Sequence, residues 1–116
     1  MKYAILLYGD PTLDPAPGTE AFDTMMAEFH ALEERMRHRA TVLAGEGLHG
    51  VDTATTVRVR DGRVDTMDGP FAETREHLGG FFLIEARSLD DALAFAAAVP
   101  VAAWGSVEVR PVEVFE

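Results

Sequence analysis

The sequence contains no cysteine among its 116 residues. Disulfides, thiolate metal sites and cysteine nucleophiles are therefore excluded, and the absence agrees with a cytoplasmic protein. The chain also lacks a run of about 20 apolar residues, the length that a membrane-spanning helix needs. The apolar stretch 3–8 is short and leads into Gly9-Asp10-Pro11 without a small-residue cleavage site. We interpret it as a buried strand rather than as a signal peptide.

Positive charge is scarce, because ten Lys and Arg face twenty Asp and Glu and leave a formal net charge of −10. Binding to nucleic acid depends on cationic contacts to phosphate, so we expect no nucleic-acid partner. The arginines at positions 58, 60 and 63 form the one basic cluster, and Asp61 and Asp65 interrupt it. Phosphate-binding loops, dinucleotide fingerprints and serine elbows are missing as well. We therefore predict no cofactor, no metal site and no membrane partner.

The composition that remains is that of a folded domain, with 47% hydrophobic and 26% charged residues. The length suits one domain over residues 1–116. Thr19 and Ser88 are plausible helix N-caps, and Asp61-Gly62 is a strong signal for a tight hairpin turn. The patterns predict strands at 2–8, 41–44, 55–60, 64–67, 80–84 and 106–114, and helices at 20–39 and 89–99.

This order of elements is two strand–helix–strand units with a hairpin inserted between them. It predicts an α+β fold, a ferredoxin-like βαβ–(β-hairpin insert)–βαβ arrangement with both helices on one side of an antiparallel sheet. The strands 2–8 and 80–84 are nevertheless apolar at successive positions, which would place apolar side chains on both faces of the sheet. The uncovered face needs a cover, since burying each such side chain contributes about 1.5–3 kcal/mol. We expect a second copy of the chain to supply it, and the alternative is that the chain's own hairpin folds over the sheet.

Several short motifs resemble those of the DGPF proteins, a branch of the YCII-related family. The tetrapeptide Asp68-Gly69-Pro70-Phe71 gives that branch its name, and the first strand ends in Tyr8-Gly9-Asp10 as theirs does. The other matching motifs, in order, are Ala44–Leu48, Thr55–Arg58 with Asp61-Gly62, Phe71–Thr74, Leu78–Phe81 and Gly105–Pro111. The resemblance covers nearly the whole chain and implies a dimeric α/β barrel.

The resemblance implies two different functions. Some YCII-related proteins are small enzymes built around a His on the first helix and an Asp after the second, including a dehydrochlorinating lyase. This chain has His30 on the first helix but Ala98 to Val101, with no acid, after the second. DGPF proteins, in contrast, are often encoded beside sigma factors of the extracytoplasmic type, which implies a regulatory role through protein contacts.

Asp68 and His30 are the two candidate catalytic residues. Asp68 could act as a general base or substrate anchor, or its carboxylate could accept backbone N–H groups and fix the loop. Gly69 and Pro70 would make that loop rigid. His30 lies at the flank of the helix's apolar stripe, where it suits either a proton shuttle or a boundary position.

Four further residues are candidate substrate contacts. Glu33 falls within the apolar stripe, so it needs a partner, which is either Arg37 one turn later or His30. Glu46 lies between two glycines at a strand end, where backbone can approach a ligand. Phe71 and Arg75 follow the tetrapeptide, and their alternative roles are core packing and a solvated loop.

The leading hypothesis is thus a homodimer that binds a small molecule and acts as a cofactor-free hydrolase or lyase. Its pocket would lie between the sheet and the first helix, with Asp68, His30 and Glu46 in its lining. The alternative hypothesis is a non-catalytic module that contacts a sigma factor.

Overall fold

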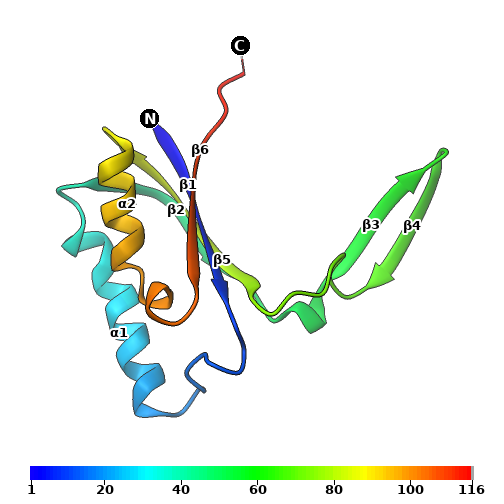
Figure 1. Ribbon diagram of the computed structural model, residues 1–116, viewed down its shortest axis with the longest axis horizontal. Coiled ribbons are helices and arrows are strands. Elements are labelled where there is room, and N and C mark those ends of the chain that lie inside the picture. The colour runs from blue at the N-terminus through cyan, green and yellow to red at the C-terminus, as the bar shows by residue number, and fades with distance from the viewer. Residues whose placement is uncertain (116) are drawn as a thin grey trace.

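The computed structural model describes residues 1–115 as an α+β fold with two antiparallel sheets and two helices, which confirms the predicted class (Figure 1). Within these residues, no helix is both long and apolar enough to span a membrane. The strands are β1 (Lys2–Gly9), β2 (Ala40–Gly47), β3 (Thr55–Arg60), β4 (Arg63–Asp68), β5 (His77–Ala86) and β6 (Ser106–Pro111). The helices are α1 (Glu20–Arg35) and α2 (Leu89–Ala98), with two short 3-10 helices, η1 (Val51–Thr53) and η2 (Pro100–Ala103).

Four strands form the main sheet in the order β2-β5-β1-β6, and every neighbouring pair is antiparallel. β1 and β5 are the central strands, which explains why their sequences are the most continuously apolar. Their register pairs Ile5 with Phe82 and Leu6 with Phe81, and it shifts between Leu7 and Tyr8. This strand order is the one expected for two strand–helix–strand units in a ferredoxin-like arrangement.

The core lies between one face of this sheet and the two helices. Ile5, Ile84 and Phe95 have no exposed surface, and Leu32 has almost none. Phe82 contacts Phe95 edge to face, with ring centroids 5.5 Å apart. The helices thus cover one sheet face with a continuous apolar layer.

Within residues 1–115, no such layer covers the opposite face of the sheet. Tyr3, Ile5 and Leu7 are buried against the core, so the alternating positions of β1 point to the other side. With the side chains that pair with them on β5, they form a half-buried apolar patch, which we call the open face: Ala4, Leu6, Tyr8, Phe81 and Leu83. The prediction that the sheet is apolar on both faces therefore holds.

The hairpin β3–β4 does not cover this open face, contrary to the alternative that we considered. Figure 1 shows both helices on one side of the four-stranded sheet and the hairpin on the other, projecting away from it. Its turn is the expected Asp61-Gly62, with φ of 52° and 74°. Both residues thus have the positive φ that a two-residue hairpin turn of type I′ requires.

Both helices begin at the residues predicted from the sequence, but the first helix ends before its predicted last residue. Phe22 donates its backbone N–H to the Thr19 hydroxyl at 3.2 Å. α1 ends at Arg35, not at the predicted residue 39, because the backbone N–H groups of Arg39 and Ala40 both bond to the Met36 carbonyl and turn the chain into β2. The basic residues 37–39 therefore follow the helix instead of forming its last turn.

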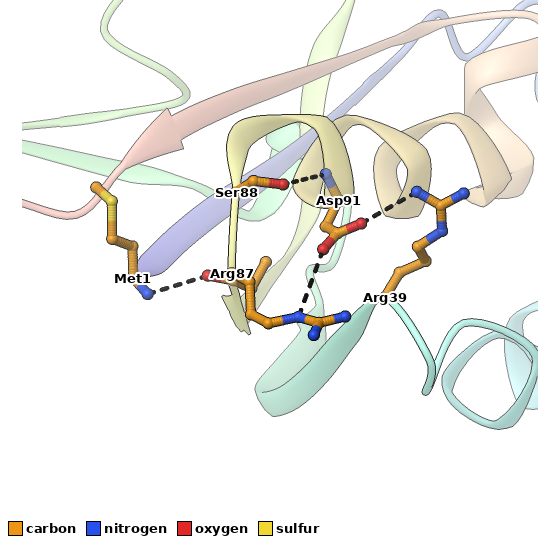
Figure 2. Close-up of polar contacts among 6 residues, drawn as sticks. Met1, Arg39, Arg87, Ser88 and Asp91 are labelled. Carbon is orange, nitrogen blue, oxygen red and sulfur yellow. Dashed lines mark hydrogen bonds and ion pairs between the residues drawn. The ribbon is translucent and has the colours of Figure 1, made fainter.

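A charged cluster joins the start of α2 to the start of β2. Figure 2 shows the Asp91 carboxylate between the guanidinium groups of Arg39 and Arg87, at 3.0 Å and 4.0 Å. The Asp91 backbone N–H also donates to the Ser88 hydroxyl, which caps α2 as predicted. The Asp91 side chain is only 14% exposed, so the two arginines neutralise a largely buried negative charge.

Candidate functional site

A cleft of about 380 Å³ lies at the end of the sheet where β1 ends and β5 begins. α1, the loop 10–19, the segment after β2 and the residue that follows η2 complete its walls. Most of its lining is apolar, and four side chains can form polar contacts: Asp14, His49, His77 and Trp104. We call this site the end cleft.

The loop 10–19 is held in place by Asp10, directly after β1. Its carboxylate accepts the Thr12 hydroxyl at 2.7 Å and the Thr12 backbone N–H at 2.9 Å. Its carbonyl oxygen accepts the N–H groups of Leu13 and Asp14. These bonds fold the chain back so that Asp14 reaches the wall of the cleft.

The same contacts change the acidity of Asp10. The bond from the Thr12 hydroxyl lowers the pKa of this carboxyl most, and the Thr12 backbone N–H lowers it further. Partial burial opposes them, and the nearby guanidinium of Arg75 and the His77 ring, when it is protonated, add to the lowering. Asp10 is therefore an ionised, 9% exposed carboxylate close to the cleft at neutral pH.

Trp104 closes the cleft from the side of η2. Its indole Nε1–H donates to the Asp14 carboxylate at 2.8 Å, which links two segments 90 residues apart. Gly105 follows, and its main chain lies so close to the Tyr8 carbonyl oxygen that a Cβ atom would collide with it. A glycine at 105 thus lets Trp104 approach the end of β1.

The two histidines come from neighbouring segments at this end of the sheet: His77 begins β5, and His49 follows β2. His77 Nε2 lies 2.9 Å from the Thr74 carbonyl oxygen, which can only accept. In the neutral ring Nε2 therefore carries the proton, and Nδ1 is a proton acceptor. His49 follows β2 in a segment whose Leu48 N–H bonds to the Gly79 carbonyl at 2.9 Å. The two rings border one cleft although they are 28 positions apart in sequence.

A second cleft, of about 340 Å³, adjoins the first. It is lined by Glu46, by Met26 and by glycines of β2 and β5, and it shares Leu7, Phe29 and Gly79 with the end cleft. We call it the Glu46 cleft. Both clefts include residues of the sheet and of α1.

The structure brings neither of the two predicted catalytic residues into either cleft. His30 is exposed on α1, and Asp68 is exposed at the end of β4. Both roles considered for Asp68 concern its carboxylate, whereas the observed loop contacts belong to the backbone of Gly69: its N–H donates to the Ala54 carbonyl, and its carbonyl accepts the Thr56 hydroxyl. Gly69 has φ of 93°, which favours glycine. The catalytic roles of Asp68 and His30 stay predictions.

The predicted substrate contacts are also spread out. Glu33 is exposed, and Arg37, one of the two partners considered for it, pairs with Glu34 at 3.4 Å. Because Glu33 faces solvent, it has no buried charge to neutralise. Phe71 is 72% exposed. Arg75 is exposed too, but its charge acts on Asp10 near the end cleft.

The residues that the sequence did not single out are the polar ones of the end cleft. Asp10 and Asp14 sit in a loop rich in Pro and Asp directly after a buried strand, and loops at strand ends often carry function. That position could have marked the two aspartates as candidate site residues. Nothing in the sequence marked His49 and His77, since the histidines lack the regular spacing of metal ligands. Within residues 1–115 no group of three His, Asp or Glu is placed to hold a metal ion.

Comparison with known proteins agrees with the fold. The family model described as the YCII-related domain matches residues 1–116. The chain belongs to the YCII-related family. One YCII-related protein of Rhizobium meliloti (strain 1021), described as uncharacterised, is 36% identical over 118 residues, which cover 100% of this chain and 95% of the relative. Both matches extend over the whole chain, and neither assigns a role to any residue.

The change in the protein's stability as the pH is lowered tests the role of Asp10. A carboxyl with a lowered folded-state pKa contributes stability above its unfolded value, near 3.8, and the contribution is lost as pH falls through the folded value. We therefore expect Asp10→Asn to lower the urea midpoint at pH 7 and to match the parent protein more closely at pH 3. Asp52→Asn, in an exposed 3-10 turn, is the control. An equal loss at both pH values would contradict the electrostatic role.

Proposed function

We propose that each chain binds a small, largely apolar molecule in the end cleft and that His77 and His49 supply acid–base chemistry there. The observation that carries the proposal is the lining, which combines apolar walls with two imidazoles and an indole–carboxylate pair. A volume of about 380 Å³ falls within the usual range of small-molecule sites. His77 Nδ1 would accept a proton from the substrate, in the manner of a cofactor-free hydrolase or lyase.

The Glu46 cleft extends this site along β2. A ligand longer than the end cleft would pass Leu7 and Gly79, which border both clefts, and place its far end beside Glu46. Gly47 of β2 and Gly79 of β5 leave open space beside it, whereas the positions next to Gly45 and Gly80 are closed by the Phe82 ring and the Glu46 main chain. The main chain of Glu46 would border this extension, whereas its side chain shares a sheet face with its register partner Phe81 and lies on the open-face side.

We also propose that the active form is a homodimer joined through the open face. The chain exposes 8202 Å², whereas a compact monomer of its mass, 12.6 kDa, exposes about 6,200 Å². An excess of about 2,000 Å² on each chain matches what obligate dimers bury. Two open faces packed together by two-fold symmetry would cover the apolar patch and close an α/β barrel.

Trp104 provides the test of ligand binding, because it is the one tryptophan of the chain and lines the end cleft. We expect members of a set of small aromatic and acyl compounds to change its emission in a saturable way. His77→Gln should weaken that binding about 3- to 10-fold, as for one lost hydrogen bond. If a bound compound is turned over, His77→Gln should lower kcat by about 100-fold or more.

His38→Gln is the matched control, because His38 lies outside both clefts. If no compound changes Trp104 emission, or if His38→Gln and His77→Gln weaken binding equally, the end cleft is not the ligand site.

A further inference from the structure

The hairpin β3–β4, residues 55–68, has an apolar face that nothing in residues 1–115 covers. Val57, Val59 and Val64 share this face, since Val59 pairs with Val64 and Val57 with Thr66. Their side chains are 59%, 56% and 67% exposed. The arginines of the hairpin lie on its other face. We call this hairpin the arm.

An isolated two-stranded hairpin is marginally stable in water. Three exposed valines on one of its faces make the isolated hairpin still less stable in water. Both of its strands are also unpaired at their outer edges. The arm also enlarges the molecule: the radius of gyration is 16.1 Å, against about 13 Å for a compact domain of this length. A hairpin that stays folded despite this exposure is expected to pack against another protein surface.

From these observations we infer that the arm docks, through its valine face, on a second copy of this chain. The arm projects on the same side of the main sheet as the open face (Figure 1). A copy that packs on the open face therefore lies beside the arm. Six residues in each strand give the arm a length of about 20 Å, enough to cross the width of a four-stranded sheet.

Charge favours a second copy as the occupant. Within the arm, Arg58, Arg60 and Arg63 balance Asp61, Asp65 and Asp68, so the whole net charge of −10 lies on the rest of the chain. The arm is thus a neutral segment that can approach an acidic copy without net repulsion. In a two-fold dimer each arm meets the equivalent surface of the other subunit, so both valine faces are covered at once.

The inference rests on the proposed dimer and adds a second contact to it. Packing of the open faces alone would leave the valine faces in water. Arm docking would remove that exposure and account for part of the excess accessible surface on each chain.

Cross-linking from the two faces of the arm tests the inference. The chain has no cysteine, so Val57→Cys and Arg58→Cys each create one labelling site, on opposite faces of the same strand. Each purified variant would carry a benzophenone maleimide, and its mass would be followed by sedimentation equilibrium before irradiation. We expect a covalent dimer from position 57 and little from position 58.

The failures of the two proposals are distinguishable. A dimer in the centrifuge that gives no cross-link from position 57, or equal cross-links from both positions, overturns arm docking and leaves the open-face dimer intact. A monomer at high concentration overturns both.

A second measurement does not depend on the label. Val59→Thr with Val64→Thr keeps strand propensity but removes apolar surface at a cross-strand pair that occurs twice in the dimer. We expect the dimer dissociation constant to rise at least about 30-fold. Met67→Thr, on the other face of the arm, should change it by less than about 3-fold. Equal effects of the two variants would overturn the inference.

Discussion

Leu6→Asp is expected to convert the proposed dimer into a folded monomer. Leu6 lies at the centre of the open face, paired with Phe81 on β5 and with Glu108 on β6. In a two-fold dimer the substitution places a carboxylate in the interface twice and removes two buried leucines. The loss of apolar burial and the cost of desolvating each charge should raise the dissociation constant by about 1,000-fold or more.

Sedimentation equilibrium on the parent protein and the variant provides the measurement. Leu89→Asp is the matched control, because Leu89 is 49% exposed and an acidic residue suits the first turn of α2. This control should stay dimeric. Circular dichroism would establish that Leu6→Asp remains folded, as expected for a side chain that points away from the core. A parent protein that is monomeric at high concentration would remove the basis of the prediction.

Much of the fold could be predicted because it depends on local chemistry. The hydroxyls of Thr19 and Ser88 bond to the first turns of their helices, and Asp61-Gly62 forms the hairpin turn. Each of these features is specified by residues within three positions of one another. The two apolar faces of β1 could also be predicted, since alternation along a strand assigns side chains to opposite sides.

The end of α1 shows where local reasoning fails. Arg37, His38 and Arg39 are acceptable helix residues, and nothing in their sequence stops the helix. Ala40 must nevertheless begin β2, where it pairs with Ala86. The tertiary pairing therefore ends the helix at Arg35.

The end cleft could not be predicted for a related reason. Its polar residues come from four separate segments, and the register that pairs Gly9 with His77 brings two of these segments together. A shift in that register between Leu7 and Tyr8 sets which residues of β5 face the cleft. No spacing in the sequence encodes a shift of this kind. Asp68, in contrast, attracted attention through a short motif whose visible structural role lies in the Gly69 backbone.

Phe95→Ala should cause the largest loss of stability within a single chain. Phe95 has no exposed surface, and its ring packs edge to face on Phe82, which stacks in turn on Phe29 of α1. Its neighbours on the same helix face, Ala92 and Ala96, are too small to fill the space. A Phe-to-Ala change in such a core lowers the free energy of unfolding by about 3–5 kcal/mol, which corresponds to a Tm lower by roughly 12–30 °C.

Thermal unfolding at a fixed protein concentration checks this prediction, since the stability of a dimer depends on concentration. Phe115→Ala is the matched control: Phe115 is 88% exposed, so the same substitution should change the free energy of unfolding by less than about 0.5 kcal/mol. A second comparison distinguishes the contribution of the core from that of the proposed dimer interface. Phe95 lies on the helix side of the sheet, so its loss should lower the Tm of a monomeric Leu6→Asp variant by a similar amount. If the two substitutions are strongly coupled instead, the sheet transmits packing from one face to the other, and core and interface form a single cooperative unit.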